Sequence, residues 1–355
     1  MREGVATGNH INGWFMPEIV VNDGTRFLSG AGSLQKSAQV IPCAGMIQCR
    51  SMPATRKILP YLALGVTILS LSFAAFFVRW ADAPAAVFGF YRLGIATLIL
   101  TPFFVRNTIL SQRKPQPHSL RRWILILPAL AGLASALDHF TWNTSLKFTS
   151  AANATLLGNT SPLWVALAAW LIFRERTKGL FWVGLALTMC GALAVLSNDF
   201  LQHPVLGWGD LLALSTGIFY AIFFLFSQRS RTYFDTLSHV WICSLSSTLV
   251  LLILTLATGS GLTGYSPRTY LVFLAAALLP QLAGYLTLGY ALGHLPASVV
   301  SPTMLGQPVL TALLAIPILG ENLQPVQWIG GLVVIAGIYL VHRGREAAPD
   351  PILGN

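Results

Sequence analysis

The stretch that decides the fold is residues 151–195, AANATLLGNTSPLWVALAAWLIFRERTKGLFWVGLALTMCGALAV, because the chain repeats its pattern at residues 297–341, ASVVSPTMLGQPVLTALLAIPILGENLQPVQWIGGLVVIAGIYLV. The two stretches are 146 positions apart and align without a gap. Several aligned positions hold identical residues in the two stretches: Pro162 and Pro308, Glu175 and Glu321, Trp182 and Trp328, Gly184 and Gly330, and Gly191 and Gly337. A repeat of this length predicts a chain built from two related halves.

The composition is that of a membrane protein. Of the 355 residues, 54% are hydrophobic and only 10% are charged, and the mean hydropathy is +0.66. A span needs about 20 mostly apolar residues. We therefore predict ten transmembrane helices, at residues 58–78, 84–105, 123–143, 150–173, 178–196, 206–227, 234–257, 267–292, 296–319 and 325–342.

The net charge of +10 reflects the placement of basic residues in loops, and we expect no nucleic-acid partner. If the N-terminus is cytoplasmic, most loop cations lie on the inner side, namely Arg106, Arg113, Lys114, Arg121, Arg122, Arg174, Arg176, Lys178, Arg229, Arg231, Arg343 and Arg345. The outer loops hold only Arg79, Lys147 and Arg268. This asymmetry predicts that both termini are cytoplasmic and that the protein spans the plasma (inner) membrane several times.

The first 55 residues differ from the rest, since they are weakly periodic and lack a continuous apolar segment of the secretory type. We expect them to be poorly ordered, and Met52, which opens MPATRKILPYLALGV, is a plausible native start; a regulatory or targeting leader is the alternative. The predicted organisation is an extension at 1–55, one repeat at 56–199, a second at 200–343 and a cytoplasmic tail at 344–355. No cysteine pair has metal-ligand or redox spacing, and we interpret Cys190 and Cys243 as small core residues.

Each half then contains five helices. Because five is odd, two consecutive units must lie in the membrane with opposite orientations, as in transporters with inverted repeats. The segments P162LWVALAAWLIFRE175 and P308VLTALLAIPILGE321, each followed by an apolar helix with glycines seven apart, resemble the duplicated EamA-type unit of the drug/metabolite transporter superfamily. The segment F90YRLGIATLIL100 is similar to that family's Arg-containing second helix. The resemblance implies a ten-helix permease that moves small metabolites between its halves, often with protons.

Arg92 and Asp138 are charges placed inside predicted spans. A guanidinium within a membrane is costly unless it meets a carboxylate, a carbonyl or water, so Arg92 either packs against a neighbouring backbone or lines the translocation pathway. Asp138 stands beside His139 in S135ALDHFTWN143. This pair could carry a proton; alternatively, Asp138 neutralises Arg92 and His139 is a wall residue.

The repeat extends these candidates to further polar positions. The shift of 146 places Ser135 on Gln281 and His139 on Tyr285, and each pair is four residues apart, so it shares a helical face. Asp138 falls on Gly284, so the acid belongs to one half only. Additional candidates are Trp142, Asn153, Asn159, Thr160, Ser301, Thr303, Gln307 and Thr311. We expect Thr303, Gln307 and Thr311, spaced by four, to form one polar stripe, although such groups often bond only a neighbouring helix. Trp142 could stack on a ligand or anchor the helix at the interface.

The most repeated residues are interpreted as structural. Pro162 and Pro308 should kink their helices and act as hinges, because proline donates no backbone hydrogen bond. The glycine pairs one heptad apart should give smooth faces for close helix contact. Glu175 and Glu321 should mark helix ends.

The sequence therefore predicts a secondary transporter, an exporter or exchanger of a small polar or amphipathic metabolite such as an amino acid, that works by alternating access with proton coupling. The chain lacks the GxxxxGK[ST] motif for direct use of ATP. We expect no metal, cofactor or catalytic residue. The alternative is an intramembrane enzyme or sensor that uses Asp138 and His139. A homodimer is left open.

Overall fold

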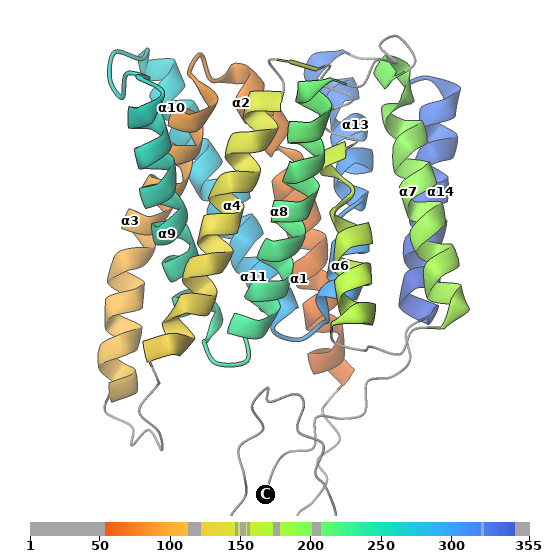
Figure 1. Cartoon of the computed structure of the whole chain (residues 1–355), viewed down its shortest axis with the longest axis horizontal. Helices are drawn as coiled ribbons and strands as arrows, with labels where there is room; N and C mark the ends of the chain where they lie inside the picture. Colours follow the sequence, from red (N-terminus) through yellow and green to blue (C-terminus); the bar gives the residue numbers. More distant parts are fainter. Residues whose placement is uncertain are drawn as a thin grey trace, which may run out of the picture. The chain divides into compact units, whose positions relative to one another are not determined.

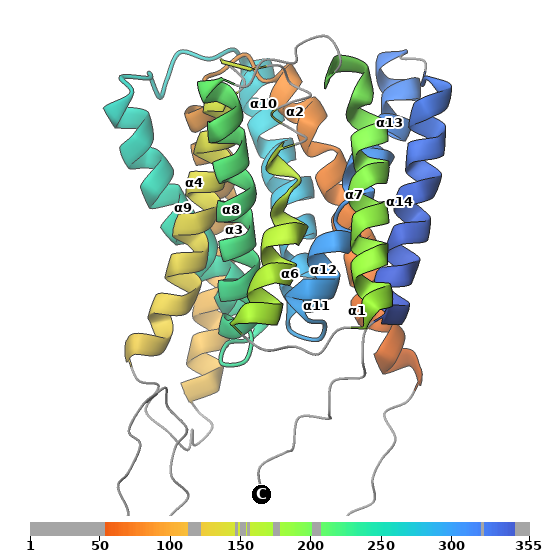
Figure 2. The ribbon, with the colours of Figure 1, turned by 45° about the vertical axis from the view of Figure 1, so that its right-hand side comes forward.

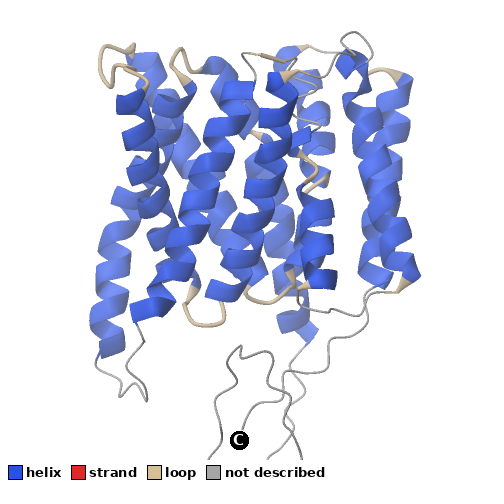
Figure 3. Ribbon diagram, viewed as in Figure 1, coloured by secondary structure: helices blue, strands red, loops and turns tan. Residues whose placement is uncertain are grey.

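The computed structural model describes residues 54–112, 122–145, 148–149, 154, 157–172, 178–200, 207–320 and 323–344. Within these residues every regular element is a helix (Figure 3), which confirms the prediction of an all-helical chain. Residues 1–53 of the predicted N-terminal extension, including Met52, and the tail from residue 345 lie outside the described residues.

The elements pack side by side as a bundle of helices that run up and down in the views of Figures 1 and 2. In chain order they are α1 (Ala54–Ser72), α2 (Ala74–Trp80), α3 (Ala85–Gln112), η1 (Arg122–Leu125), α4 (Ile126–Ser145), α6 (Ser161–Leu171), α7 (Gly179–Phe200), α8 (Trp208–Ser230), α9 (Thr236–Ala257), α10 (Pro267–Ala276), η2 (Ala277–Gly284), α11 (Tyr285–Leu292), α12 (Ala297–Thr303), α13 (Gly306–Leu319) and α14 (Pro325–Gly344). The start of α1 and the end of α14 lie at the same end of this bundle (Figure 1), here called the lower end.

Seven helical segments are long and apolar enough to cross a membrane, among them Ile58–Trp80, Pro267–Leu292 and Ala297–Ile318. Two shorter apolar helices, Ser161–Leu171 and Gly179–Val195, and α4 follow the same course through the bundle. The chain is thus a multi-pass membrane protein. One boundary differs from the prediction: α3 continues to Gln112, so Arg106 belongs to a helix and not to a loop.

Helices that hold equivalent positions in the two repeats pack in reciprocal pairs. Helix α7 lies along α14, and α3 lies along α9. Helix α4 packs on α8, and its counterpart, formed by η2 and α11, packs on α1. The duplication read from the sequence is therefore matched by a duplicated set of helix contacts.

The contact between α7 and α14 depends on the predicted glycines. A Cβ atom at Gly184 would lie 2.5 Å from the backbone nitrogen of Val341, and one at Gly191 would lie 2.6 Å from that of Val334. These distances are shorter than any normal contact, so only glycine permits this approach of the two helices.

Gly191→Ala should lower the stability of the purified protein by about 1–3 kcal/mol, because the added methyl group overpacks the α7–α14 interface. The measurement is thermal unfolding in detergent. Gly65→Ala is the matched control, since nothing lies within 4 Å of a Cβ atom there and alanine is the better helix former. Equal stability of the two variants would contradict a close α7–α14 contact.

Several of the helices are interrupted near the middle of the bundle. The first span breaks at Phe73 between α1 and α2, and the ninth breaks at Met304–Leu305 between α12 and α13. The eighth span contains η2, a wider π-helical segment with Pro280 inside it. Such irregular backbone at membrane depth is typical of segments that line a cavity.

The two repeated prolines restart helices after breaks. Pro162 is in the first turn of α6, directly after a turn at Asn159–Thr160, and Pro308 is in the first turn of α13. At these positions the missing N–H group is not needed for a helical hydrogen bond. The predicted kinks are therefore complete interruptions at matching places in the two copies; the hinge role stays a prediction. The interpretation of Cys190 as a core residue is wrong, because its side chain is exposed, whereas Cys243 is buried.

Candidate functional site

A cavity of about 460 Å³ lies in the upper half of the bundle, between the two repeats. Its polar and aromatic lining includes most of the residues singled out from the sequence, namely Arg92, Asp138, His139, Trp142, Asn159, Tyr285, Gln307 and Thr311, and Pro308 lines it as well. The remaining wall is mostly apolar and small, with Ala74, Ala75, Val78, Ala312 and Ala315. A volume in this range suits a small-molecule ligand.

Arg92 reaches the cavity from α3 and is only 4% exposed. Its Nε donates a hydrogen bond to Oε1 of Gln281 at 3.1 Å, and its guanidinium carbon lies 5.7 Å from the ring centre of Tyr285. Both partners come from the eighth span, where the π-helical turn positions Gln281 one residue after Pro280. The guanidinium is thus fixed by an amide and an aromatic face, and it keeps its positive charge uncompensated by these contacts.

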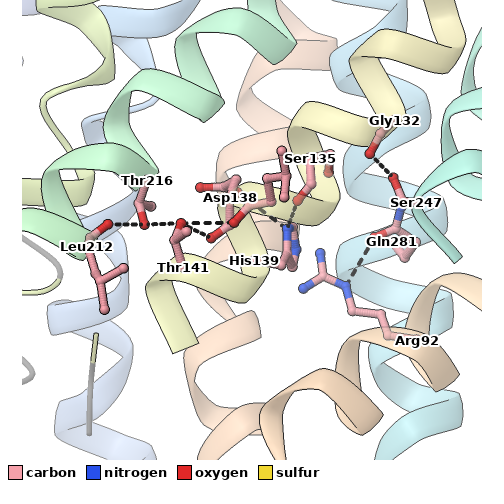
Figure 4. Close-up of polar contacts among 11 residues, drawn as sticks. Arg92, Gly132, Ser135, Asp138, His139, Thr141, Leu212, Thr216, Ser247 and Gln281 are labelled. Atoms are coloured by element: carbon pink, nitrogen blue, oxygen red, sulfur yellow. Dashed lines mark hydrogen bonds and ion pairs between the residues drawn. The ribbon is translucent and has the colours of Figure 1, made fainter. Parts of the chain in front are cut away.

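Asp138 and His139 project from α4 (Figure 4) and line the same cavity as Arg92. His139 Nδ1 lies 2.7 Å from the carbonyl oxygen of Ser135 and 3.3 Å from Oδ2 of Asp138. Because a nitrogen that bonds a carbonyl must carry the hydrogen, neutral His139 keeps its lone pair on Nε2. The side chains of Asp138 and His139 are 14% and 15% exposed, so both remain accessible to a ligand in the cavity.

Arg92 and Asp138 line the same cavity without direct contact. Within the described residues, Oδ2 of Asp138 lies beside Nδ1 of His139, and Nε of Arg92 donates a hydrogen bond to Gln281. Asp138 acts on Arg92 at longer range through its charge, and the interpretation that Asp138 neutralises Arg92 stays a prediction. A cation and an anion face the cavity from separate helices, and a molecule that carries both signs of charge would complement them.

The breaks in the first and ninth spans are joined by hydrogen bonds beside the cavity. The amide of Gln307 donates to the carbonyl of Leu71 at 3.2 Å, and the hydroxyl of Thr311 donates to the carbonyl of Ser72 at 3.2 Å. These carbonyls lie at the end of α1, where the helix leaves them without intrahelical partners. Side chains from one repeat thus satisfy the broken helix of the other and hold α2, with Arg79, at the edge of the cavity.

Two residues predicted for the site, Thr303 and Gln281, lie outside the lining of the cavity. Thr303 does not line the cavity: its hydroxyl bonds the carbonyl of Val299 at 2.7 Å and lies 3.0 Å from Nε2 of His342. The predicted continuous stripe is wrong because the break at Met304–Leu305 separates Thr303 from Gln307. Gln281 acts through Arg92 and lies outside the lining of the large cavity. Asn153 falls outside the described residues.

The structure also adds cavity residues that the sequence analysis did not select. Arg79 lines the cavity from the last turn of α2, where the positive-inside pattern had placed it in an outer loop. Phe76 and Tyr220 contribute aromatic surface. Thr216 also lines the cavity, and its hydroxyl lies 2.8 Å from that of Thr141, which joins α8 to α4 (Figure 4). Their only sequence signal was polarity or aromaticity at membrane depth, which many packing residues share.

The lower half of the bundle is closed by packed apolar side chains. The main core cluster includes Leu64, Val165, Phe224, Leu288, Leu292, Leu295 and Val300. Two polar links lie at the lower end: Arg231 Nε donates to the carbonyl of Gly289 at 2.8 Å, and the amide of Ala297 donates to Oε1 of Gln228 at 2.8 Å. Among the described residues, the polar cavity therefore stands above a half that is packed with apolar side chains.

A multi-pass helical bundle with broken helices around a half-enclosed polar cavity defines a membrane transporter. The profile of the EamA-like transporter family matches the chain twice, at residues 57–197 and 207–343. The chain therefore belongs to the EamA-like transporter family, within the drug/metabolite transporter superfamily, and its two matching regions indicate a duplicated unit. This is a family of transporters and not of enzymes, so the alternative of an intramembrane enzyme is set aside.

Relatives and one solved structure agree with this assignment. An uncharacterized transporter of Archaeoglobus fulgidus is 25% identical over 284 residues, covering 79% of this chain and 95% of that protein. The uncharacterized inner membrane transporter YedA of Escherichia coli K12 is 24% identical over 282 residues, covering 75% and 84%. A crystal structure of a protein 16% identical in sequence superposes with a TM-score of 0.66 over 79% of this chain and 95% of that one, which shows a shared fold.

Proposed function

We propose that this protein is a secondary active transporter that exports or exchanges a small amino-acid-like metabolite by alternating access, with proton coupling. The observation that carries the proposal is that a cation, Arg92, and a carboxylate, Asp138, line one cavity and form no salt bridge with each other within the described residues. Binding in the cavity, followed by closure above and opening below, would carry the molecule through the membrane.

The proposed architecture is ten spans in two inverted five-helix repeats. Seven long apolar segments, two shorter ones and α4 supply the ten spans. An odd number of spans in each repeat requires that the second enter the membrane in the opposite orientation. The reciprocal helix pairs, such as α7 with α14, are what an inverted repeat about a central axis produces.

The charges of the loops supply the proposed orientation. Arg229 and Arg231 lie at the lower end of α8, and Arg343 lies at the lower end of α14. By the positive-inside tendency this end is cytoplasmic, in the plasma membrane. The large cavity then opens to the outside, and the present conformation is an outward-facing one.

The proposed substrate class follows from the polarity of the cavity. A carboxylate would pair with Arg92, whose planar fork suits bidentate recognition, and an ammonium group would approach Asp138. The small apolar residues of α2 and α13 and the aromatic rings of Phe76 and Trp142 leave room for a short apolar side chain. An amino acid satisfies all three surfaces.

Transport by the purified protein in liposomes tests the function. Loaded with a mixture of unlabelled amino acids, vesicles should take up radiolabelled amino acids by exchange, and an outside-acidic or outside-alkaline pH gradient should change net flux. Empty liposomes and vesicles with an unrelated membrane protein are the controls. Absence of flux for every amino acid in both modes would contradict the proposed substrate class.

A further inference from the structure

A second, much smaller chamber lies below the large cavity. It has a volume of about 10 Å³, close to the minimum that holds one water molecule. Its polar lining consists of Ser135, His239, Cys243, Ser244, Ser247, Gln281 and Tyr285. One water there would have the several polar partners that a buried water needs.

His239 is the titratable group at the lower side of this chamber. It is 2% exposed and lies one turn into α9, four residues after the exposed Asp235. Its Nδ1 lies 3.0 Å from the hydroxyl of Ser230 on α8. Its Nε2 has only the sulfur of Cys243, at 3.7 Å, as a hydrogen-bond partner within the described residues, so this nitrogen lacks a strong oxygen or nitrogen partner.

The chamber connects with the substrate cavity through shared residues. Tyr285 lines both spaces. Gln281 accepts the hydrogen bond of Arg92 on one side, and its Nε2 lies 3.5 Å from the hydroxyl of Ser244 on the other. Figure 4 shows the hydrogen bond between Arg92 and Gln281, and Ser247 lines the small chamber together with Gln281. A continuous polar path therefore runs from the Arg92 region, through the closed half, to within one helical turn of the lower end.

The other charged or titratable groups around His239 are few. Arg231 and Asp235 flank it from the loop before α9, and Cys243 adjoins it on α9 itself. The elements packed against it present Ser230 from α8 and Gly289 from α11. Within the described residues, one cation and one anion therefore flank His239, and the neighbours from α8 and α11 are uncharged.

We propose that His239 is a proton-binding residue of the lower half and that a water in the small chamber passes protons between it and the Tyr285 hydroxyl at the substrate cavity. This inference rests on the proposed function, because it assigns the route by which protons cross the packed lower half while substrate does not. Neutral His239 accepts a proton from the lower end on its free ring nitrogen. The same ring nitrogen then gives this proton to the chamber water, and the water passes one of its own protons to the oxygen of Tyr285. Tyr285 at the same time releases its hydroxyl proton into the substrate cavity that it lines, so each group returns to its starting state.

The test uses proteoliposomes that contain a trapped pH-sensitive dye and the amino acid with the fastest exchange in the panel above. His239→Gln should reduce substrate-coupled proton flux and uptake driven by a pH gradient by roughly tenfold or more, the scale at which a positioned proton carrier contributes. Exchange of labelled for unlabelled amino acid at equal pH should stay within about twofold, since the substrate cavity is unchanged. His294→Gln is the matched control, because His294 is exposed at the same end.

A second variant guards against loss of folding in His239→Gln. A Cβ atom at Gly289 would lie 3.0 Å from Cγ2 of Val240 and 3.7 Å from Cδ2 of His239, so Gly289→Ala would fill part of the chamber without changing its charge. It should also slow proton flux and spare exchange. Full proton-driven uptake in both variants would overturn the role of His239. Absence of amino-acid exchange by the wild-type protein would instead refute the proposed function. Failure of the His239 proposal and failure of the proposed function are therefore distinguishable.

Discussion

Arg92→Ala is expected to reduce amino-acid exchange by about two orders of magnitude or more, because it removes the cation that holds the substrate carboxylate. Loss of a buried charge-assisted contact costs about 2–5 kcal/mol, and 2.7 kcal/mol corresponds to roughly a hundredfold. The measurement is initial exchange in proteoliposomes at matched protein content.

The geometry separates this effect from a general loss of structure. Arg92 makes one hydrogen bond to Gln281 and a ring contact with Tyr285. Arg92→Gln keeps an amide that can bond Gln281 but removes the charge, and it should be nearly as inactive as the alanine variant. Arg92→Lys keeps the charge without the planar fork and should retain partial activity with weaker substrate binding.

Arg268→Gln is the matched control for this series. Arg268 is exposed in the first turn of α10, so the same loss of charge there should leave exchange unchanged. Monodisperse elution and an unchanged melting temperature must accompany the inactive Arg92 variants. Exchange at the wild-type rate in folded Arg92→Gln would show that the substrate does not need this cation, and the zwitterion hypothesis would fail.

The sequence carried most of the fold because its signals were local and repeated. Long apolar runs placed the spans to within a few residues, and the eighth predicted span, 267–292, coincides with α10, η2 and α11. The glycines one heptad apart identified the α7–α14 contact because a backbone approach of this kind admits no Cβ atom. The break at Phe73 had no such signal, since neither proline nor glycine interrupts α1 there.

The candidate site was less predictable because it depends on which face each helix directs towards the cavity. The sequence singled out polar residues whose burial in the membrane costs free energy. Four of them line one cavity, namely Arg92, Asp138, His139 and Tyr285. Thr303 was assigned to the same face as Gln307 on the assumption of an unbroken helix, and the break after it turns it towards His342. Ser244 and His239, which extend the polar path downwards, are visible only when α9 and η2 are packed together.

Asp138→Asn is expected to abolish uptake driven by a pH gradient and to raise the KM of exchange by about tenfold, the scale of one charge-assisted contact. A carboxylate in the cavity binds either a proton or the ammonium group of the substrate, and it cannot hold both. Proton binding therefore releases the substrate, and this competition converts a proton gradient into export. Asparagine has nearly the same shape but binds neither cation strongly.

The position of Asp138 makes this competition effective. Its side chain is accessible to the cavity, it pairs with a histidine that can take up charge of its own, and the repeat places glycine at the equivalent position of the other half. One acid at this position in the two repeats means one carboxylate for which a proton and the substrate compete. Asp82→Asn, in an exposed position between α2 and α3, is the control and should preserve both gradient-driven uptake and KM. If Asp138→Asn still accumulated amino acid against its concentration gradient, the coupling acid would have to be another residue. The expected result is that the variant loses uptake driven by the pH gradient but keeps exchange. Substrate passage and proton coupling would then be separable at a single carboxylate.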